Sequence, residues 1–162
     1  MKIKIQFAQS EKDYYTTKIL FKEYANSLDF SLSFQDFDKE LENIPGKYKK
    51  PDGCIILACK NSDSIGCVGM RPLDGITCEI KRLYIKPDYR GFGLGKLLTK
   101  KVLEYCIERG YIKVFLDTTS SMESAINIYK SLGFLETSPY YNNPLSNVIF
   151  FELNLDNERG KK

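Results

Sequence analysis

The sequence of 162 residues contains no histidine and no tryptophan. The absence of histidine excludes Ser-His-Asp and Cys-His nucleophilic catalysis, and it excludes zinc sites built on histidine. Any acid–base step near neutral pH must therefore use Glu, Asp, Lys, Tyr, Cys or a water molecule. We accordingly expect a protein that binds no metal.

Long apolar runs are also missing, since no stretch approaches the ~18 residues of a membrane span. Residues 1–7 alternate between apolar and polar, as in a strand, and lack the continuous apolar region of a signal peptide. The net charge of +3 is small, and the charges are dispersed along the chain. These features predict a cytoplasmic protein that uses neither a membrane nor a nucleic acid as a partner.

Cysteine is present, but not in a pattern typical of metal sites or disulfides. The chain has five cysteines, an odd number, and no C-x-x-C pair. Their neighbours are those of apolar strands, so we expect reduced thiols in the core.

Three alternating glycines stand in Arg90-Gly91-Phe92-Gly93-Leu94-Gly95-Lys96, at a predicted junction between strand and helix. The strand covers residues 78–85, and the helix over 94–109 has apolar residues at three- and four-residue spacing. Glycine permits tight turns and a close approach of the backbone to a ligand. The free N–H groups and the dipole of a helix N-terminus favour an anion. The stretch therefore predicts a binding site for a pyrophosphate.

Two common phosphate motifs do not fit this stretch. A P-loop requires G-x-x-x-x-G-K-[ST], but Arg90 stands six positions before Lys96, and Leu97 replaces the Ser/Thr. The dinucleotide fingerprint G-x-G-x-x-G needs one more residue between the second and third glycines. A nucleotide-binding protein is thus disfavoured.

A third pattern does fit. Arg90-x-x-Gly93-x-Gly95 resembles the acyl-CoA signature, Gln/Arg-x-x-Gly-x-Gly/Ala, of the GNAT superfamily of N-acetyltransferases. Ile128-Tyr129-Lys130-Ser131-Leu132-Gly133-Phe134 resembles a later motif of the same superfamily. The two motifs span roughly residues 78–134. The loop Pro139-Tyr140-Tyr141-x-Asn143-Pro144 resembles a little-characterised bacterial subfamily.

The rest of the chain has the periodicities of alternating strands and helices. Ser10 is typical of an N-cap, and Ser120 with Glu123 has the spacing of a capping box. The predicted strands are 2–7, 54–60, 65–70, 78–85, 113–117 and 148–155, and the predicted helices are 11–26, 33–43, 94–109 and 122–132. This order predicts an α/β fold with one mixed sheet of the α+β type, flanked by helices. We expect a single domain over 1–155 and a frayed tail over 156–162.

The resemblance implies the same architecture and a site for acetyl-CoA as cosubstrate. In the superfamily the two central strands, here 78–85 and 113–117, splay apart and admit the pantetheine arm of the cofactor. The residues that the resemblance assigns to this cofactor are Leu83, Tyr84, Ile85, Arg90, Gly91, Phe92, Gly93, Leu94, Gly95 and Lys96.

The resemblance also implies catalytic roles. Tyr129 is the expected general acid, because many members carry a tyrosine here near the thioester sulfur. Glu79 on the central strand is the expected base, either directly or through water. Independently of the resemblance, Asp117 at the end of the strand 113–117 is a weaker alternative, for which a structural role is the preferred interpretation. The competing interpretations are that Tyr129 is a core residue that only packs, and that Glu79 is a surface residue of its strand.

The acceptor site is expected at the proline-bounded loop, where Tyr140 and Tyr141 would line the pocket at low entropy cost. Arg71 and Arg82 would pair with an anionic acceptor or act as ordinary surface charges. The sequence does not decide which amine is acetylated, and a homodimer is one assembly that it leaves open.

The sequence thus predicts an enzyme that transfers an acetyl group to a primary amine of a small molecule or peptide, directly within a ternary complex. The alternative is a non-catalytic acyl-CoA-binding sensor or interaction module. Met122, which stands where many members carry a cofactor-contacting asparagine, favours that alternative.

Overall fold

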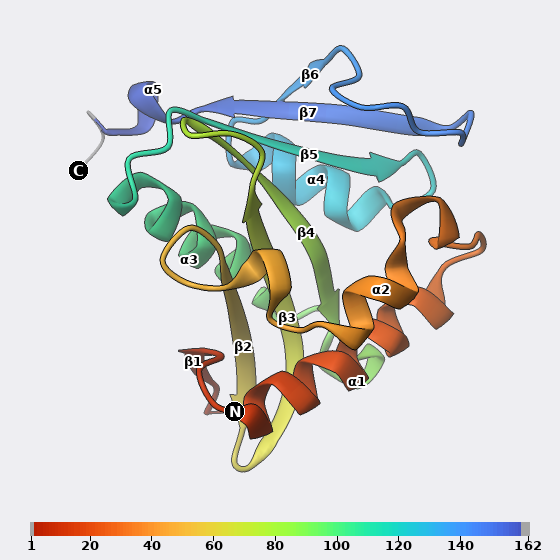
Figure 1. Ribbon diagram of the computed structural model, residues 1–162, viewed down its shortest axis with the longest axis vertical. Coiled ribbons are helices and arrows are strands. Elements are labelled where there is room, and N and C mark those ends of the chain that lie inside the picture. Colours follow the sequence, from red (N-terminus) through yellow and green to blue (C-terminus); the bar gives the residue numbers. More distant parts are fainter. Residues whose placement is uncertain (1, 160–162) are drawn as a thin grey trace.

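The computed structural model describes residues 2–159 (Figure 1). Over these residues, seven strands form one sheet in the order β1-β2-β3-β4-β5-β7-β6. The strands are β1 (Lys4–Phe7), β2 (Cys54–Lys60), β3 (Asp63–Pro72), β4 (Thr77–Ile85), β5 (Lys113–Thr119), β6 (Leu135–Thr137) and β7 (Val148–Asn154). The α-helices are α1 (Glu11–Ser27), α2 (Phe37–Glu42), α3 (Leu94–Glu108), α4 (Glu123–Ser131) and α5 (Leu155–Arg159).

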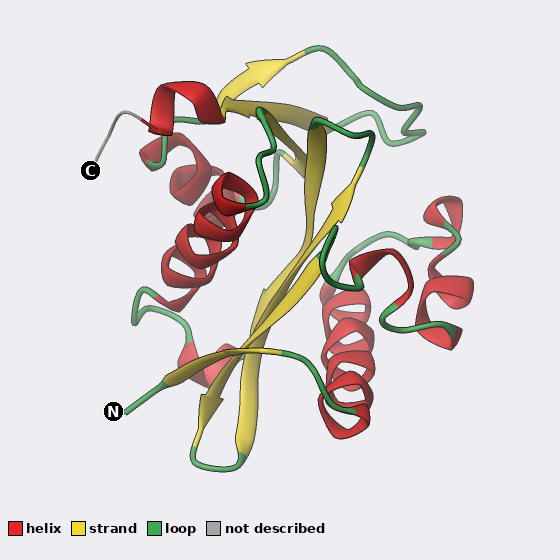
Figure 2. Cartoon of the chain, turned by 60° about the vertical axis from the view of Figure 1, so that its left-hand side comes forward, coloured by secondary structure: helices red, strands yellow, loops and turns green. Residues whose placement is uncertain are grey.

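Helices cover both faces of this sheet, and Figure 2 shows one long helix on either side of it. On one face, Leu20 and Phe21 of α1 pack with residues of α2 and β2 in one buried cluster. On the other face, Leu98 and Val102 of α3 belong to a second buried cluster that also includes α4 and β5. The predicted mixed sheet flanked by helices is confirmed.

The start of α1 follows the sequence signal. Ser10 Oγ accepts a hydrogen bond from the Asp13 backbone N–H at 3.1 Å, and the Asp13 carboxylate accepts from the Ser10 N–H at 3.3 Å. The capping box predicted at Ser120 and Glu123 is wrong, because α4 is capped by Met122 without a side-chain hydrogen bond. The Ser120 N–H instead donates to the Asn147 carbonyl, which ties this residue to the loop before β7.

Other differences lie in short elements. The predicted helix 33–43 is split at Asp36, whose φ of +54° separates the 3₁₀ turn η1 (Ser33–Gln35) from α2. The short strand β6, which the sequence does not reveal, pairs antiparallel with β7. The predicted frayed tail begins as helix α5, because the Arg159 guanidinium donates to the backbone carbonyls of Tyr111 and Ile107. Residues 160–162 lie outside the described residues.

The two central strands separate along their length. β4 and β5 run parallel, but they pair only where Thr77–Glu79 face Lys113–Phe115. Beyond Glu79 each strand continues without the other as its partner (Figure 1). The splay that the resemblance implied is therefore present, and it opens the sheet toward the ends of β4 and β5.

A β-bulge interrupts β4 at the point of separation. Cys67 of β3 faces Tyr84 and Gly69 faces Lys81, so β4 contains one extra residue between these pairs. Arg82 has a left-handed φ of +63° there. A bulge of this kind increases the local twist and changes which face each side chain points to.

The bulge places two consecutive cationic side chains on one face. Ile80 and Leu83 both pack in the cluster under α3 and α4. Lys81 follows Ile80 and therefore points to the opposite face. Arg82 also points to that face, because its guanidinium bonds Glu40 of α2.

No helix within residues 2–159 combines the length and the apolar character that a bilayer crossing requires.

Candidate active site

A groove of about 1000 Å³ lies where β4 leaves β5, beside the first turns of α3 and α4. Its size is at the upper end of typical ligand sites. The predicted cofactor residues that line it are Leu83, Tyr84, Ile85, Arg90, Gly91, Gly93, Leu94, Gly95 and Lys96. Phe92, the remaining one, is 63% exposed and does not line the groove.

The three glycines serve two different purposes. Gly91 and Gly93 have φ of +87° and +80°, a conformation that favours glycine, and a Cβ at either would meet nothing within 4 Å. A Cβ on Gly95 would lie 3.0 Å from Ile128 Cδ1 of α4. The first two glycines therefore shape the loop, and the third lets α3 and α4 approach each other.

The N-terminus of α3 offers backbone donors to the groove. Gly93 is the N-cap, and no side chain caps this helix. Arg90 lies directly before it, with Nε donating to the Ile85 carbonyl at 2.9 Å and the guanidinium 5.7 Å from the Tyr84 ring centroid. Uncapped N–H groups beside a fixed guanidinium form an environment suited to phosphate oxygens.

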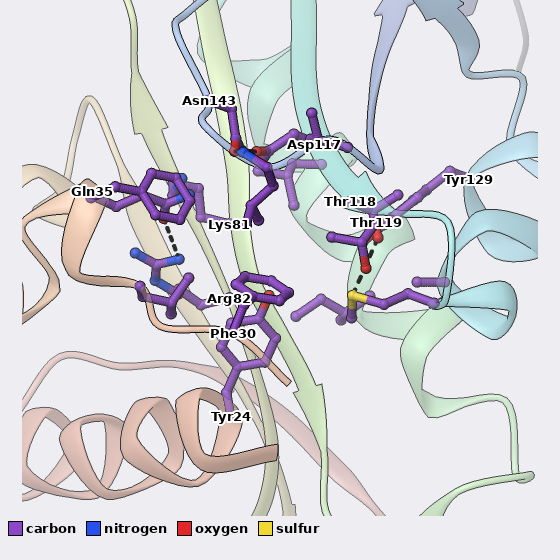
Figure 3. A pocket seen from close by; sticks show the side chains of 18 residues that line it. Tyr24, Phe30, Gln35, Lys81, Arg82, Asp117, Thr118, Thr119, Tyr129 and Asn143 are labelled. Atoms are coloured by element: carbon purple, nitrogen blue, oxygen red, sulfur yellow. Dashed lines mark hydrogen bonds between the residues drawn. The ribbon is translucent and has the colours of Figure 1, made fainter. Parts of the chain in front are cut away.

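A smaller cavity of about 50 Å³ adjoins the groove (Figure 3). Residues that line both spaces form the junction between them: Tyr24, Phe30, Leu83, Thr119, Met122 and Ala125. The cavity is also lined by Lys81, Arg82, Asp117, Tyr129 and Asn143. The two spaces thus place a large ligand and a small polar group next to each other.

Tyr129 reaches the small cavity from α4. It is 6% exposed, and its ring packs against Phe134 and Phe151 with centroids 5.7 and 6.1 Å away. Its hydroxyl has no hydrogen-bond partner among residues 2–159. Burial raises the pKa of the phenol above its usual value, so the group holds its proton at neutral pH.

Asp117 is a carboxylate that lines the small cavity. The Tyr141 hydroxyl donates to its Oδ2, and Asn143 Nδ2 donates to the same atom at 3.1 Å. These two donors, both from the loop before β7, fix the orientation of the carboxylate. Figure 3 shows Asn143 beside Asp117.

Glu79, the predicted base, lies in a buried network behind the cavity. It is 1% exposed and does not line the cavity. Its Oε1 accepts from Arg71 Nε at 3.0 Å, and its Oε2 accepts from the Tyr140 hydroxyl. Lys81 Nζ is 3.8 Å from Oε2 and is the link between this network and the cavity.

The two tyrosines predicted for the acceptor pocket reach it indirectly. Tyr140 packs between Phe115 and Phe150, with ring centroids 5.0 and 5.4 Å away. Tyr141 contacts Asp117 and accepts a hydrogen bond from Gln35 Nε2 at 3.2 Å. From this loop it is Asn143, together with Leu145, that lines the cavity.

The two arginines that were candidates for an anionic acceptor each have a carboxylate of the chain as partner. Arg71 pairs with Glu79. Arg82 donates through Nε and Nη2 to Glu40 at 2.9 and 3.2 Å, and through Nη1 to Gln35 at 2.8 Å. Arg82 is 4% exposed, so its interpretation as a surface charge is wrong.

Sequence reasoning missed Lys81 and Asn143 as site residues. The sequence patterns assign no role to Lys81, although this residue stands in the predicted strand 78–85 at the centre of the sheet. A cation at such a position is itself a signal of a functional role, since lysine is rarely fully buried.

All five cysteines are free and buried, as predicted.

The sequence matches a family of known enzymes. Residues 14–134 match the Acetyltransferase (GNAT) family. An uncharacterized N-acetyltransferase of Schizosaccharomyces pombe is 38% identical over 155 residues, which cover 94% of this chain and 95% of that protein. The chain belongs to the GNAT family, and it is therefore an acyltransferase.

Solved structures have the same fold. A GNAT-family acetyltransferase from Staphylococcus aureus superposes with a TM-score of 0.77 at 25% identity, covering 95% of this chain and 99% of that one. A putative acetyltransferase from Salmonella typhimurium, solved with its cofactor acetyl-CoA, superposes with a TM-score of 0.73 at 20% identity, covering 95% and 94%.

Proposed function

We propose that this chain transfers an acetyl group from acetyl-CoA to a primary amine of a small molecule or peptide, directly and within a ternary complex. The observation that carries the proposal is the junction of the groove with the small cavity at Leu83, Met122 and Ala125. Two adjoining sites suit direct transfer, because both reactants are bound in contact before the reaction. No nucleophile of the protein is needed.

Acetyl-CoA fits the groove in size and in chemistry. The uncapped start of α3 and Arg90 suit the pyrophosphate, and the free side of β4 at Leu83 and Ile85 suits an extended, amide-containing arm. When bound, acetyl-CoA supplies the acetyl group as a reactive thioester. The Salmonella structure holds this cofactor on the same fold, which supports the assignment.

Tyr129 is the proposed general acid. The transfer forms an amide C–N bond and breaks the thioester C–S bond, so one proton must leave the amine and one must reach the thiolate. The Tyr129 hydroxyl lines the cavity beside the junction and is protonated at neutral pH. It can therefore donate the proton that the thiolate takes up.

The proton acceptor has two candidates. Asp117 lines the cavity and can face an amine bound there. Glu79, the base expected from the resemblance, lies behind Lys81, so a proton would reach it only through another group or a water. The role of Glu79 stays a prediction, and Asp117 is the candidate with direct access.

The competing function is a non-catalytic acyl-CoA-binding module. Met122 lines both spaces at the start of α4, and the Thr118 hydroxyl donates to its sulfur at 3.3 Å. An assay of thiol release from acetyl-CoA with a panel of amines separates the two functions. Amine-dependent release supports the transferase, and tight acetyl-CoA binding without release for any amine supports the module.

A further inference from the structure

Lys81 presents an ammonium group to the small cavity without a hydrogen-bond acceptor. Lys81 as a whole is 5% exposed, yet it lines the cavity. Among residues 2–159 no group accepts a hydrogen bond from Nζ, and its ion pair with Glu79 Oε2 spans 3.8 Å, too long for a hydrogen bond. A buried ammonium in this state lowers stability, so a ligand that supplies acceptor oxygens would complete the site.

The other cations near the cavity are already paired. Arg82 is occupied by Glu40 and Gln35, and Arg71 by Glu79. The second oxygen of Glu79 accepts from Tyr140. Lys81 is therefore the cation with donors available to a ligand.

An anion lines the same cavity. Asp117 is oriented by Tyr141 and Asn143 and leaves room for a donor from the cavity side. Figure 3 places Lys81 between Arg82 and the pair formed by Asp117 and Asn143. One available cation and one anion in a single small space are complementary to a molecule that carries both a carboxylate and an amine.

The volume restricts the size of that molecule. A cavity of about 50 Å³ has room for about four water molecules, which is comparable to the head of a small amino acid. Phe30 and Phe34 line it as apolar surface. Bulky polycationic acceptors match neither this volume nor the positive charge of the unpaired Lys81 ammonium.

We propose that the acceptor is an amine that carries its own carboxylate, with small free amino acids as the simplest members, and that Lys81 binds this carboxylate while Asp117 faces the amine. The inference rests on the proposed function, because it names the acceptor class of the same site. Lys81 is then a specificity-determining residue.

Matched pairs of acceptors test the class. Thiol release from acetyl-CoA is measured with free amino acids and with amines that lack only the carboxylate, such as alanine against ethylamine. We expect kcat/KM to be at least about 100-fold higher for the amino acids, because a buried donor left unpaired rejects the analogue. Equal kcat/KM values within the pairs would overturn the inference. A complete absence of thiol release with every amino acid tested would also overturn it.

Variants test the residue. Lys81→Met should raise KM for the amino acid at least about 30-fold with a smaller change in kcat, and Lys81→Arg should restore part of the affinity. Lys113→Met is the matched control, since Lys113 pairs with Glu152 and does not line the cavity; its KM should not change. A lower kcat and a shifted pH–rate profile at unchanged KM would instead make Lys81 a proton-transfer group and contradict the proposal.

The test separates this inference from the proposed function. If amines without a carboxylate are acetylated with the same kcat/KM as amino acids, the transferase assignment stands and the proposed acceptor class is wrong. If acetyl-CoA fails to bind in calorimetry, both fail together.

Discussion

Tyr129 is the residue on which the proposed chemistry depends most. Replacing it by Phe keeps the ring that packs against Phe134 and Phe151 and removes the hydroxyl in the cavity. We expect kcat to fall about 100-fold, within the range of general acid catalysis, while the Kd for acetyl-CoA changes less than about 2-fold. Steady-state kinetics and calorimetry on both proteins measure the two quantities.

The pH dependence gives an independent check on Tyr129. Burial raises the pKa of its phenol, so the acid form persists above pH 10, the ordinary value of tyrosine. We therefore expect kcat to show no decline assignable to Tyr129 as pH rises to about 10. A decline below that pH that vanishes in Tyr129→Phe would contradict the raised pKa of the phenol, whereas an unchanged kcat in Tyr129→Phe would contradict its role as the acid.

The two carboxylates can be distinguished by the rates of their amide variants. Asp117→Asn should lower kcat/KM about 100-fold if Asp117 is the base, because the amine then loses its acceptor. Glu79→Gln should cause a loss of this size only if Glu79 is the base. If Glu79→Gln keeps most of the rate while Asp117→Asn loses it, Asp117 is the base.

Lys81 should be unfavourable for stability. Burial lowers the pKa of its ammonium group, and nearby Glu79 only partly offsets this effect. The ammonium group therefore has a lower pKa in the folded protein than in the unfolded chain. Its cost to stability is complete at pH values below the folded-state pKa, and it disappears as the pH rises to the unfolded-state pKa. We expect Lys81→Met to raise Tm by about 2–4 °C at pH 7, equivalent to about 1 kcal/mol.

Thermal unfolding at several pH values tests this expectation. The gap in Tm between Lys81→Met and the parent should narrow as pH approaches about 10. Lys113→Met, at a half-exposed ion pair, should show no such gap. A Tm of Lys81→Met below that of the parent at pH 7 would show that the ammonium stabilises the fold.

Single residues were only partly predictable from the sequence. The glycines and Tyr129 stand in motifs with a local physical purpose, and the structure places them at the groove and the cavity. The state of Lys81 depends on a bulge at Arg82 and on contacts with residues far along the chain. No local pattern encodes such contacts, so the sequence alone assigns Lys81 no role in the site.

At the scale of elements, the N-terminus of α3 is the part of the site that the sequence specifies best. Gly93→Asp places a carboxylate on the N-cap, at φ +80° and in open space, a conformation that Asp tolerates better than most residues. We expect the fold to persist and the affinity for coenzyme A to fall at least about 100-fold, because the new charge repels the pyrophosphate.

Gly110→Asp is the matched control for this change. Gly110 follows the other end of α3, with φ +86° and no atom within 4 Å of an added Cβ. Its backbone strain is therefore similar, but it does not line the groove. Calorimetric titration with coenzyme A should give parent-like affinity for Gly110→Asp, and equal affinity for both variants would remove the pyrophosphate assignment.

Long periodic elements were predicted well and short ones were not. Helix α3 and strands β2 and β4 lie close to their predicted bounds, because each carries several apolar residues at a clear spacing. The three residues of β6 are too few to show a period, and β6 exists through pairing with β7. Helix α5 depends on the long-range hydrogen bonds of Arg159.

At the scale of the whole molecule, the site exists because β4 and β5 pair at one end only. The α1–α2 layer closes the cavity through Phe30 and Gln35, and Arg82 ties that layer to the bulge. The α3–α4 layer provides the groove. The groove and the small cavity, which we propose as donor and acceptor sites, are therefore covered from opposite faces of one sheet and meet where its strands diverge.

The most direct test of this account is a calorimetric titration of the protein with acetyl-CoA and, in parallel, with S-acetylpantetheine, which lacks the pyrophosphate and the nucleotide. The account predicts a Kd of about 1–50 μM for acetyl-CoA, equivalent to about −6 to −8 kcal/mol, and binding at least about 100-fold weaker for S-acetylpantetheine. Equal affinity for the two ligands, or no binding of acetyl-CoA, would contradict the assignment of the groove.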